Sequence, residues 1–298
     1  MMFKNIFKFA ESTEILKETR KNVSEMSIFR EIFIFIGIFF SIMIIRLFAG
    51  KALVSSLNLP NEYSLLLTLF SYAIGAILYC LVVIKLEKRS LRSIGFSKDN
   101  IPLSILKGLI IGFLMFLAVV GIGLLLGQYI FKGFDSSTLI LGIPFLLGFF
   151  VQSFTEEIQY RGWAMTYISK RHSVFIGFLI SDLLFVLMHM FNNGISIIAM
   201  INIFIVGLLF TALFLKYDNI WVCGSAHAMW NFTQGYLFGF NVSGKEMACL
   251  FSFGQNSQSI IGGGTFGPES SLIATFVIII TLIIVLYWDK INKTSIAS

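Results

Sequence analysis

The chain has 298 residues, of which 57% are hydrophobic and 13% are charged, and its net charge is +6. A soluble domain carries about 25% charged residues, so this composition cannot cover a water-facing surface. The excess of hydrophobic residues also excludes a disordered chain, and three cysteines without a CxxC pair exclude a disulfide scaffold, which leaves a membrane protein with several spans.

Apolar windows of membrane-spanning length recur along the whole chain. A bilayer core requires about 20 mostly apolar residues per helix. Such windows predict eight spans, at residues 31–48, 63–84, 109–130, 139–160, 173–191, 195–215, 220–240 and 272–288. The predicted fold is an all-α polytopic membrane protein, a bundle of about eight transmembrane helices with a polar cavity inside the membrane. No repeat or linker divides residues 31–288, so they are expected to form one membrane domain.

The distribution of Lys and Arg predicts how the spans are oriented. With the N-terminus in the cytoplasm, 18 of these residues fall in cytoplasmic segments and three on the other side. This bias predicts a multi-pass protein of the cell membrane with both termini cytoplasmic. Residues 1–30 are then a cytoplasmic arm without an evident signal peptide, and residues 289–298 are a cytoplasmic tail. Because the basic residues lie beside spans, their charge does not indicate nucleic acid.

The longest external segment, residues 241–271, contains the run GQNSQSIIGGGTFGPESS. A phosphate-binding loop is disfavoured because there is no GK[ST] and no preceding strand with a following helix. We expect a flexible external turn.

The fourth span ends in two carboxylates and an arginine. An ionisable side chain at the centre of a membrane helix costs about 2.5 to 3.5 kcal/mol, so it requires a partner or a task. Glu157 and Arg161 are four residues apart, acid first, which favours an ion pair. Glu156 is rotated by about 100° from Glu157 and is expected to stay free. The alternative is that both glutamates only cap the span at the membrane interface.

Two of the three histidines fall inside apolar windows. His189 follows Phe185 by one helical turn, and His227 precedes Asn231 by one turn. A single intramembrane histidine is more often a residue that hydrogen-bonds between helices. Two histidines, an asparagine and a free glutamate on three spans instead favour a functional site between spans four, five and seven.

Three short motifs connect these residues to a known family. EEIQYR fits EExxxR, FVLMH fits FxxxH and HAMWN fits HxxxN, in this order on successive segments. The chain therefore resembles the CAAX-protease and bacteriocin-processing enzyme family, which includes the type II CAAX prenyl endopeptidases. The resemblance covers a protease-like core at about residues 139–240. The run GGTFGPES before the last span is a weaker match to the same family.

The resemblance implies an intramembrane endopeptidase with a membrane-associated or lipidated peptide or protein as substrate. It implies that Glu156 is the general base that activates water, that His189 helps to hold this water, and that His227 and Asn231 donate to the oxyanion. Glu157 and Arg161 support the site. Bacterial relatives are associated with peptide maturation or bacteriocin self-immunity. The competing hypothesis is a non-catalytic membrane protein, such as an immunity scaffold or a small-solute transporter.

Other chemistries stay open at this point. Glu156, His189 and His227 form a set that a divalent metal such as zinc uses in hydrolases, although HExxH is absent, so the cofactor is left undecided. Cys223 lies one turn before His227, but a buried apolar cysteine is the commoner case. Asp182 stands alone, since no second intramembrane aspartate accompanies it.

The predicted depths of the site residues do not agree. His189 lies at the outer end of the fifth span, whereas Glu156 lies low in the fourth. We therefore expect the fourth helix to begin near Pro144 and continue toward Lys170, with a tilted fifth helix or a break at FNNG.

Overall fold

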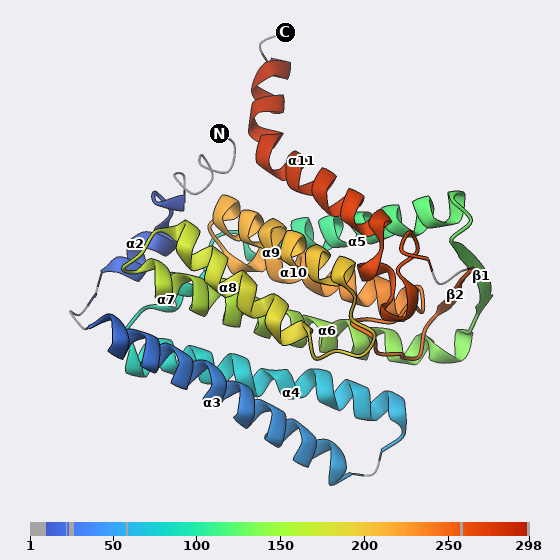
Figure 1. The fold of residues 1–298 in the computed structure, drawn as a ribbon, viewed down its shortest axis with the longest axis horizontal. Coiled ribbons are helices and arrows are strands. Elements are labelled where there is room, and N and C mark those ends of the chain that lie inside the picture. The colour runs from blue at the N-terminus through green and yellow to red at the C-terminus, as the bar shows by residue number, and fades with distance from the viewer. Residues whose placement is uncertain (1–9, 22, 24–26, 58, 257–258, 297–298) are drawn as a thin grey trace.

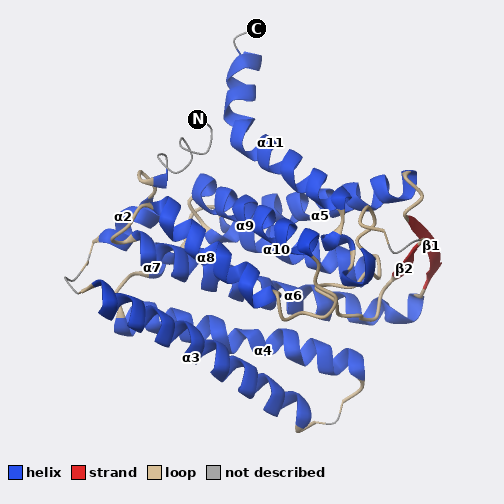
Figure 2. Ribbon diagram, viewed as in Figure 1, coloured by secondary structure: helices blue, strands red, loops and turns tan. Residues whose placement is uncertain are grey.

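The computed structural model describes residues 10–21, 23, 27–57, 59–256 and 259–296. The chain is mostly helical, at 75%, and Figure 2 shows helices throughout, with one short pair of strands at one end. Residues 1–9, 22 and 24–26 of the predicted N-terminal arm and residues 297–298 of the predicted tail lie outside the described residues. Within the arm, Thr13 caps helix α2 (Glu14–Arg20) by accepting from the Leu16 backbone N–H.

Helices α3 (Ile28–Ser55) and α4 (Asn61–Leu81) form a pair along one side of the molecule (Figure 1). The buried residues of α3 are four, four, three and eight positions apart, at Glu31, Phe35, Phe39, Ile42 and Gly50. This spacing places them on one face of the helix, and most of the remaining apolar side chains point outward. Such an outward apolar surface is what a lipid-facing helix requires.

Close contact with a neighbouring helix positions the helix that carries His227 and Asn231. Helix α5 (Ile101–Leu125) packs against α10 (Ile220–Phe232) through Gly108 and Gly112. A Cβ at Gly108 would lie 2.3 Å from the Val222 carbonyl oxygen, and one at Gly112 would lie 2.2 Å from that of Ala226. Small residues four apart allow two backbones to approach this closely, so these glycines set the position of α10.

The fourth helical segment continues through a change of helix type. Helix α6 (Gly142–Glu157) passes directly into a π-helical stretch, η4 (Ile158–Met165), and then into α7 (Thr166–Ser169). The extension expected between Pro144 and Lys170 is therefore present. The remaining helical elements are α8 (Val174–His189), α9 (Ile197–Tyr217), α11 (Leu272–Ile296), the π-helical η1 (Val82–Leu86) and η5 (Thr233–Leu237), and the 3₁₀ turns η2 (Leu91–Ile94), η3 (Ser136–Leu141), η6 (Gly264–Phe266) and η7 (Pro268–Ser270).

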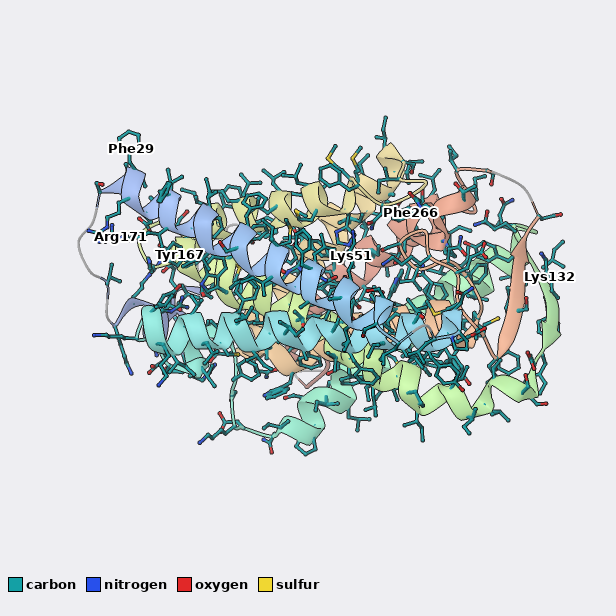
Figure 3. All side chains as sticks on the ribbon, turned by 90° about the horizontal axis from the view of Figure 1, so that it is seen from below. Phe29, Lys51, Lys132, Tyr167, Arg171 and Phe266 are labelled. Atoms are coloured by element: carbon teal, nitrogen blue, oxygen red, sulfur yellow. The ribbon has the colours of Figure 1, made fainter. Side chains whose placement is uncertain are left out.

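A two-stranded sheet closes one end of the helical body. Strands β1 (Tyr129–Phe134) and β2 (Phe251–Gln255) pair in antiparallel fashion. Figure 3 places Lys132 of β1 at the end opposite to Phe29 and Arg171. The fold is therefore mostly helical rather than all-α. The third predicted span, residues 109–130, is wrong at its end, because residues 129–130 belong to β1. Residues 241–271, expected to form a flexible external turn, contain a strand and two 3₁₀ turns.

Five of the described helical segments are long and apolar enough to cross a membrane, and they correspond to predicted spans one to four and six. They are Ile28–Ser55, Asn61–Leu86, Ile101–Leu125, Ser136–Ser169 and Ile197–Tyr217. Two shorter apolar helices, Val174–His189 and Leu272–Tyr287, correspond to predicted spans five and eight. The multi-span character is confirmed, whereas the count of eight stays a prediction.

Candidate active site

A buried chain of ion pairs joins three helical segments. Arg161, on the π-helical stretch, donates to Glu157 Oε1 at 3.2 Å and to Asp182 Oδ1 of α8 at 3.1 Å. All three side chains are at most 1% exposed. The predicted pair between Glu157 and Arg161 is confirmed. Asp182, which has no second intramembrane aspartate in the sequence, has Arg161 as its partner.

A glycine makes room for these ion pairs. Gly207 of α9 faces Asp182, and a Cβ at this position would lie 1.8 Å from Asp182 Oδ1 and 2.8 Å from Arg161 Nη2. Phe185 and Phe210 lie against the guanidinium, with ring centroids 4.6 and 5.7 Å from its central carbon. Gly207 therefore leaves room for the ion pairs, and the two aromatic rings cover the guanidinium.

His227 links this ion-pair cluster to a second carboxylate. Its Nδ1 lies 2.9 Å from Glu157 Oε1, and its Nε2 lies 3.8 Å from Glu156 Oε2. The Phe210 ring stacks on the imidazole at a centroid distance of 4.9 Å. Because the Glu157 carboxylate is paired with Arg161 and can only accept, we assign the hydrogen to Nδ1. Nε2 is then the nitrogen that faces Glu156.

Glu156 faces a pocket, as its predicted rotation away from Glu157 requires. The pocket has a volume of about 230 Å³ and is lined by all four predicted catalytic residues, Glu156, His189, His227 and Asn231. The Glu156 side chain is 13% exposed, in contrast to the fully buried Glu157. The fold therefore brings together residues that lie up to 75 positions apart in the sequence.

His189 reaches the same pocket from the end of α8. Its Nδ1 lies 2.8 Å from the Phe185 carbonyl oxygen, one turn earlier, and this contact leaves Nε2 for the pocket. The helix ends at His189 and the chain turns through residues 190–194, so the expected break at FNNG is present. His189 and Glu156 line one pocket, so the mismatch in their predicted depths does not keep them apart.

Asn231 is engaged with the fourth helix in this structure. Its Nδ2 donates to Gln152 Oε1 at 3.1 Å and to Ser153 Oγ at 3.3 Å. An oxyanion can receive a hydrogen bond from Asn231 only if one of these contacts opens. Gln152 also lines the pocket, so an entering substrate can compete for this amide.

Four further charged residues at or beside the pocket were not predicted as site residues. Arg46, Lys245 and Glu269 line the pocket, and Asp182 holds Arg161 behind it. Arg46 falls within the first predicted span, residues 31–48. Its position four residues after Ile42 continues the buried stripe of α3, and this spacing could have indicated that it faces the bundle.

The three candidate metal ligands, Glu156, His189 and His227, line one pocket. Among the residues that the structure describes, no group of three His, Cys, Asp or Glu side chains lies close enough to hold a metal ion in this arrangement. A metal at this set stays a prediction. Cys223 is buried and donates its thiol to the Ile220 carbonyl oxygen, 3.3 Å away, in its own helix.

The fold and the pocket define a multi-span membrane protein whose helices enclose an ionisable site. Residues 137–233, the segment that holds all three motifs, match the family model described as type II CAAX prenyl endopeptidase Rce1-like. The resemblance drawn from the motifs is thus confirmed, and the chain is Rce1-like over this segment. This family indicates a CAAX-type membrane protease. No curated protein and no solved structure gives a significant match to the chain.

Proposed function

We propose that the protein is an intramembrane endopeptidase that hydrolyses a peptide bond in a membrane-associated or lipidated peptide or protein, with Glu156 as the base. One observation carries the proposal: Glu156 and His227 face each other at 3.8 Å in a pocket lined by residues of several helices. We take this pocket to be the intramembrane cavity in which water and substrate meet.

In the first step Glu156 takes a proton from a water molecule while the water oxygen bonds to the carbonyl carbon of the substrate. The electron pair of the C=O bond moves to the carbonyl oxygen, which becomes an oxyanion. A base in this position contributes about 10² to 10⁴ to the rate. His189, whose Nε2 is left for the pocket, is positioned to hold the same water.

Stabilisation of the oxyanion is the task we assign to His227 and Asn231. With one hydrogen on Nδ1, His227 donates from Nε2 only when the ring is doubly protonated. In that form it also balances the negative charge left by two carboxylates against one guanidinium in the cluster behind it. Collapse of the intermediate breaks the C–N bond, and the proton held by Glu156 passes to the leaving nitrogen.

The ion pairs of Arg161 have a positioning role in this proposal. Glu157 fixes the orientation of His227, and Arg161 and Asp182 fix Glu157. None of these three side chains lines the pocket, so they act through His227 rather than on the substrate.

The proposed biological role is maturation of a peptide or self-immunity to a bacteriocin, as in bacterial members of the family.

The test of the proposed protease activity is cleavage of a panel of membrane peptides by the purified protein in nanodiscs, with Glu156→Gln as a matched control and with and without a chelator. Cleavage by the wild type and none by Glu156→Gln supports the proposal. No cleavage of any peptide by the wild type favours the non-catalytic alternative. Loss on chelation that added zinc restores would assign a metal to the site.

A further inference from the structure

The segment GGTFGPES carries a carboxylate for which the proposed reaction has no task. Glu269 lies on η7, in the connection that leads into α11, and it lines the same pocket as Glu156 and His227. Phe266, three residues earlier and labelled in Figure 3, is buried and anchors this connection in the hydrophobic core. The carboxylate therefore reaches the pocket from outside the segment that contains the three motifs.

Fixed backbone contacts determine where Glu269 lies. Asn202 of α9 donates through Nδ2 to the carbonyl oxygens of Glu269 and Ser271, at 2.8 and 2.9 Å. Gly267 has φ +109°, and a Cβ there would lie 2.4 Å from the Asn241 carbonyl oxygen. The turn thus depends on a glycine at this position and on Asn202 of α9, and the side chain of Glu269 lies at the pocket wall.

The Glu269 carboxylate has polar neighbours but no Lys or Arg partner. Glu269 Oε2 accepts from the Ser243 backbone N–H at 3.0 Å and from Ser243 Oγ at 3.4 Å, and both donors are neutral. Among the described residues no Lys or Arg forms an ion pair with it, although Lys245 lines the same pocket. Burial raises the pKa of Glu269 to about 7. An ionised carboxylate in such surroundings lacks the counter-charge that a buried ion requires.

Building on the proposed function, we propose that Glu269 is a specificity residue that binds a cationic group of the peptide substrate, the ammonium of a lysine or the guanidinium of an arginine near the scissile bond. Ser243 fixes one carboxylate oxygen, so the group is oriented before the substrate arrives. The cation of the substrate supplies the missing counter-charge, and it does so in the pocket that contains Glu156. The preference is therefore for a basic residue close to the cleaved bond.

Binding can be measured separately from cleavage. The Glu156→Gln protein in detergent micelles is titrated with fluorescein-labelled membrane peptides that are identical except for one residue, lysine or norleucine, placed in turn at each position around the candidate cleavage site. We expect one position at which the lysine peptide binds about tenfold tighter than the norleucine peptide, the size expected for a charge-assisted hydrogen bond. Adding Glu269→Gln should remove this preference, and adding Glu269→Asp should retain part of it.

The matched control is Glu246→Gln, a carboxylate on the same external segment that is exposed and does not line the pocket. It should leave the preference unchanged. Equal binding of lysine and norleucine peptides at every position, or a preference that persists in Glu269→Gln, would overturn the inference.

Cleavage by the otherwise wild-type enzyme gives a second readout. Glu269→Gln should raise KM for the preferred lysine peptide and leave kcat largely unchanged. An equal loss of kcat for all peptides would assign Glu269 to the chemical step instead, and the specificity role would be wrong. If no peptide is cleaved but the binding preference is present, the proposed protease function fails while the cation site stands.

Discussion

Two sides of the same site differ in how their charges are matched. Behind the pocket, Glu157, Arg161 and Asp182 are paired with one another and fully buried. At the pocket, Glu156 has His227 at 3.8 Å, and Glu269 has neutral donors only. Matched charges in a low-dielectric interior fix structure, whereas incompletely matched ones remain able to bind or exchange a proton. Substitutions on the two sides should therefore separate stability from activity.

The largest expected effect is the loss of proteolysis in Glu156→Gln. Removal of the general base should lower the single-turnover cleavage rate by about 10² to 10⁴. The side chain is partly exposed to the pocket and the substitution keeps its shape, so the midpoint of thermal unfolding in detergent should stay close to that of the wild type. Cleavage at the wild-type rate would show that Glu156 is not the base.

Arg161→Ala should affect stability as strongly as activity. It leaves Glu157 and Asp182 as two buried carboxylates without a cation, a loss of about 3 to 5 kcal/mol for a broken buried pair. Thermal and denaturant unfolding in detergent measure this loss.

Neutralising Glu157 and Asp182 in the Arg161→Ala variant tests whether its instability comes from unpaired carboxylates. Glu157→Gln alone should recover only part of the stability lost in Arg161→Ala, because Asp182 stays buried without its Arg161 partner. The triple variant with Asp182→Asn as well should recover more. An unchanged unfolding midpoint for Arg161→Ala would mean that the ion pairs contribute nothing to folding.

Loss of His227 and loss of Asn231 should affect the cleavage rate alike but the stability of the fold differently. Each alanine substitution should lower the cleavage rate by about 10² to 10³ if both donate to the oxyanion. His227→Ala should also destabilise the fold because it removes the partner of Glu157, whereas Asn231→Ala removes contacts to Gln152 and Ser153 only. Single-turnover kinetics, unfolding midpoints and metal analysis of both variants make the comparison. Metal bound by the wild type and lost only in His227→Ala would make His227 a ligand.

The smallest effect concerns the pH dependence of stability through Glu269. Burial raises the pKa of this carboxyl from 4.5 to about 7, so folding favours its protonated form. That contribution is fully present below about pH 4.5 and is lost as the pH rises through about 7. Glu269→Gln cannot ionise, so its stability relative to the wild type should rise between pH 5 and pH 8, by up to about 3 kcal/mol at about 1.36 kcal/mol per pKa unit. A difference that does not change with pH would show that Glu269 does not titrate in this range.

The sequence by itself determined the class of protein and singled out four residues that line one pocket. A backbone in lipid must satisfy its own hydrogen bonds, so it forms helices. The side chains of these helices face lipid, so each span appears in the sequence as a long apolar run. Spacing within one helix predicted the pair between Glu157 and Arg161, since residues four apart lie on one face. The three motifs placed Glu156, His189, His227 and Asn231 in one family pattern, and all four line one pocket.

Only the tertiary structure decided which helices meet and what each charge faces. Asp182 contacts Arg161 because the fourth helix changes to a π-helix after Glu157 and because Gly207 leaves room, and neither fact has a signature in local periodicity. Glu269 joins the pocket through a loop that is fixed by contacts to Asn202, far away in the sequence. Hydrophobicity and helical spacing are local properties of the chain, whereas the pairing of buried charges depends on the packing between segments, which no local pattern encodes.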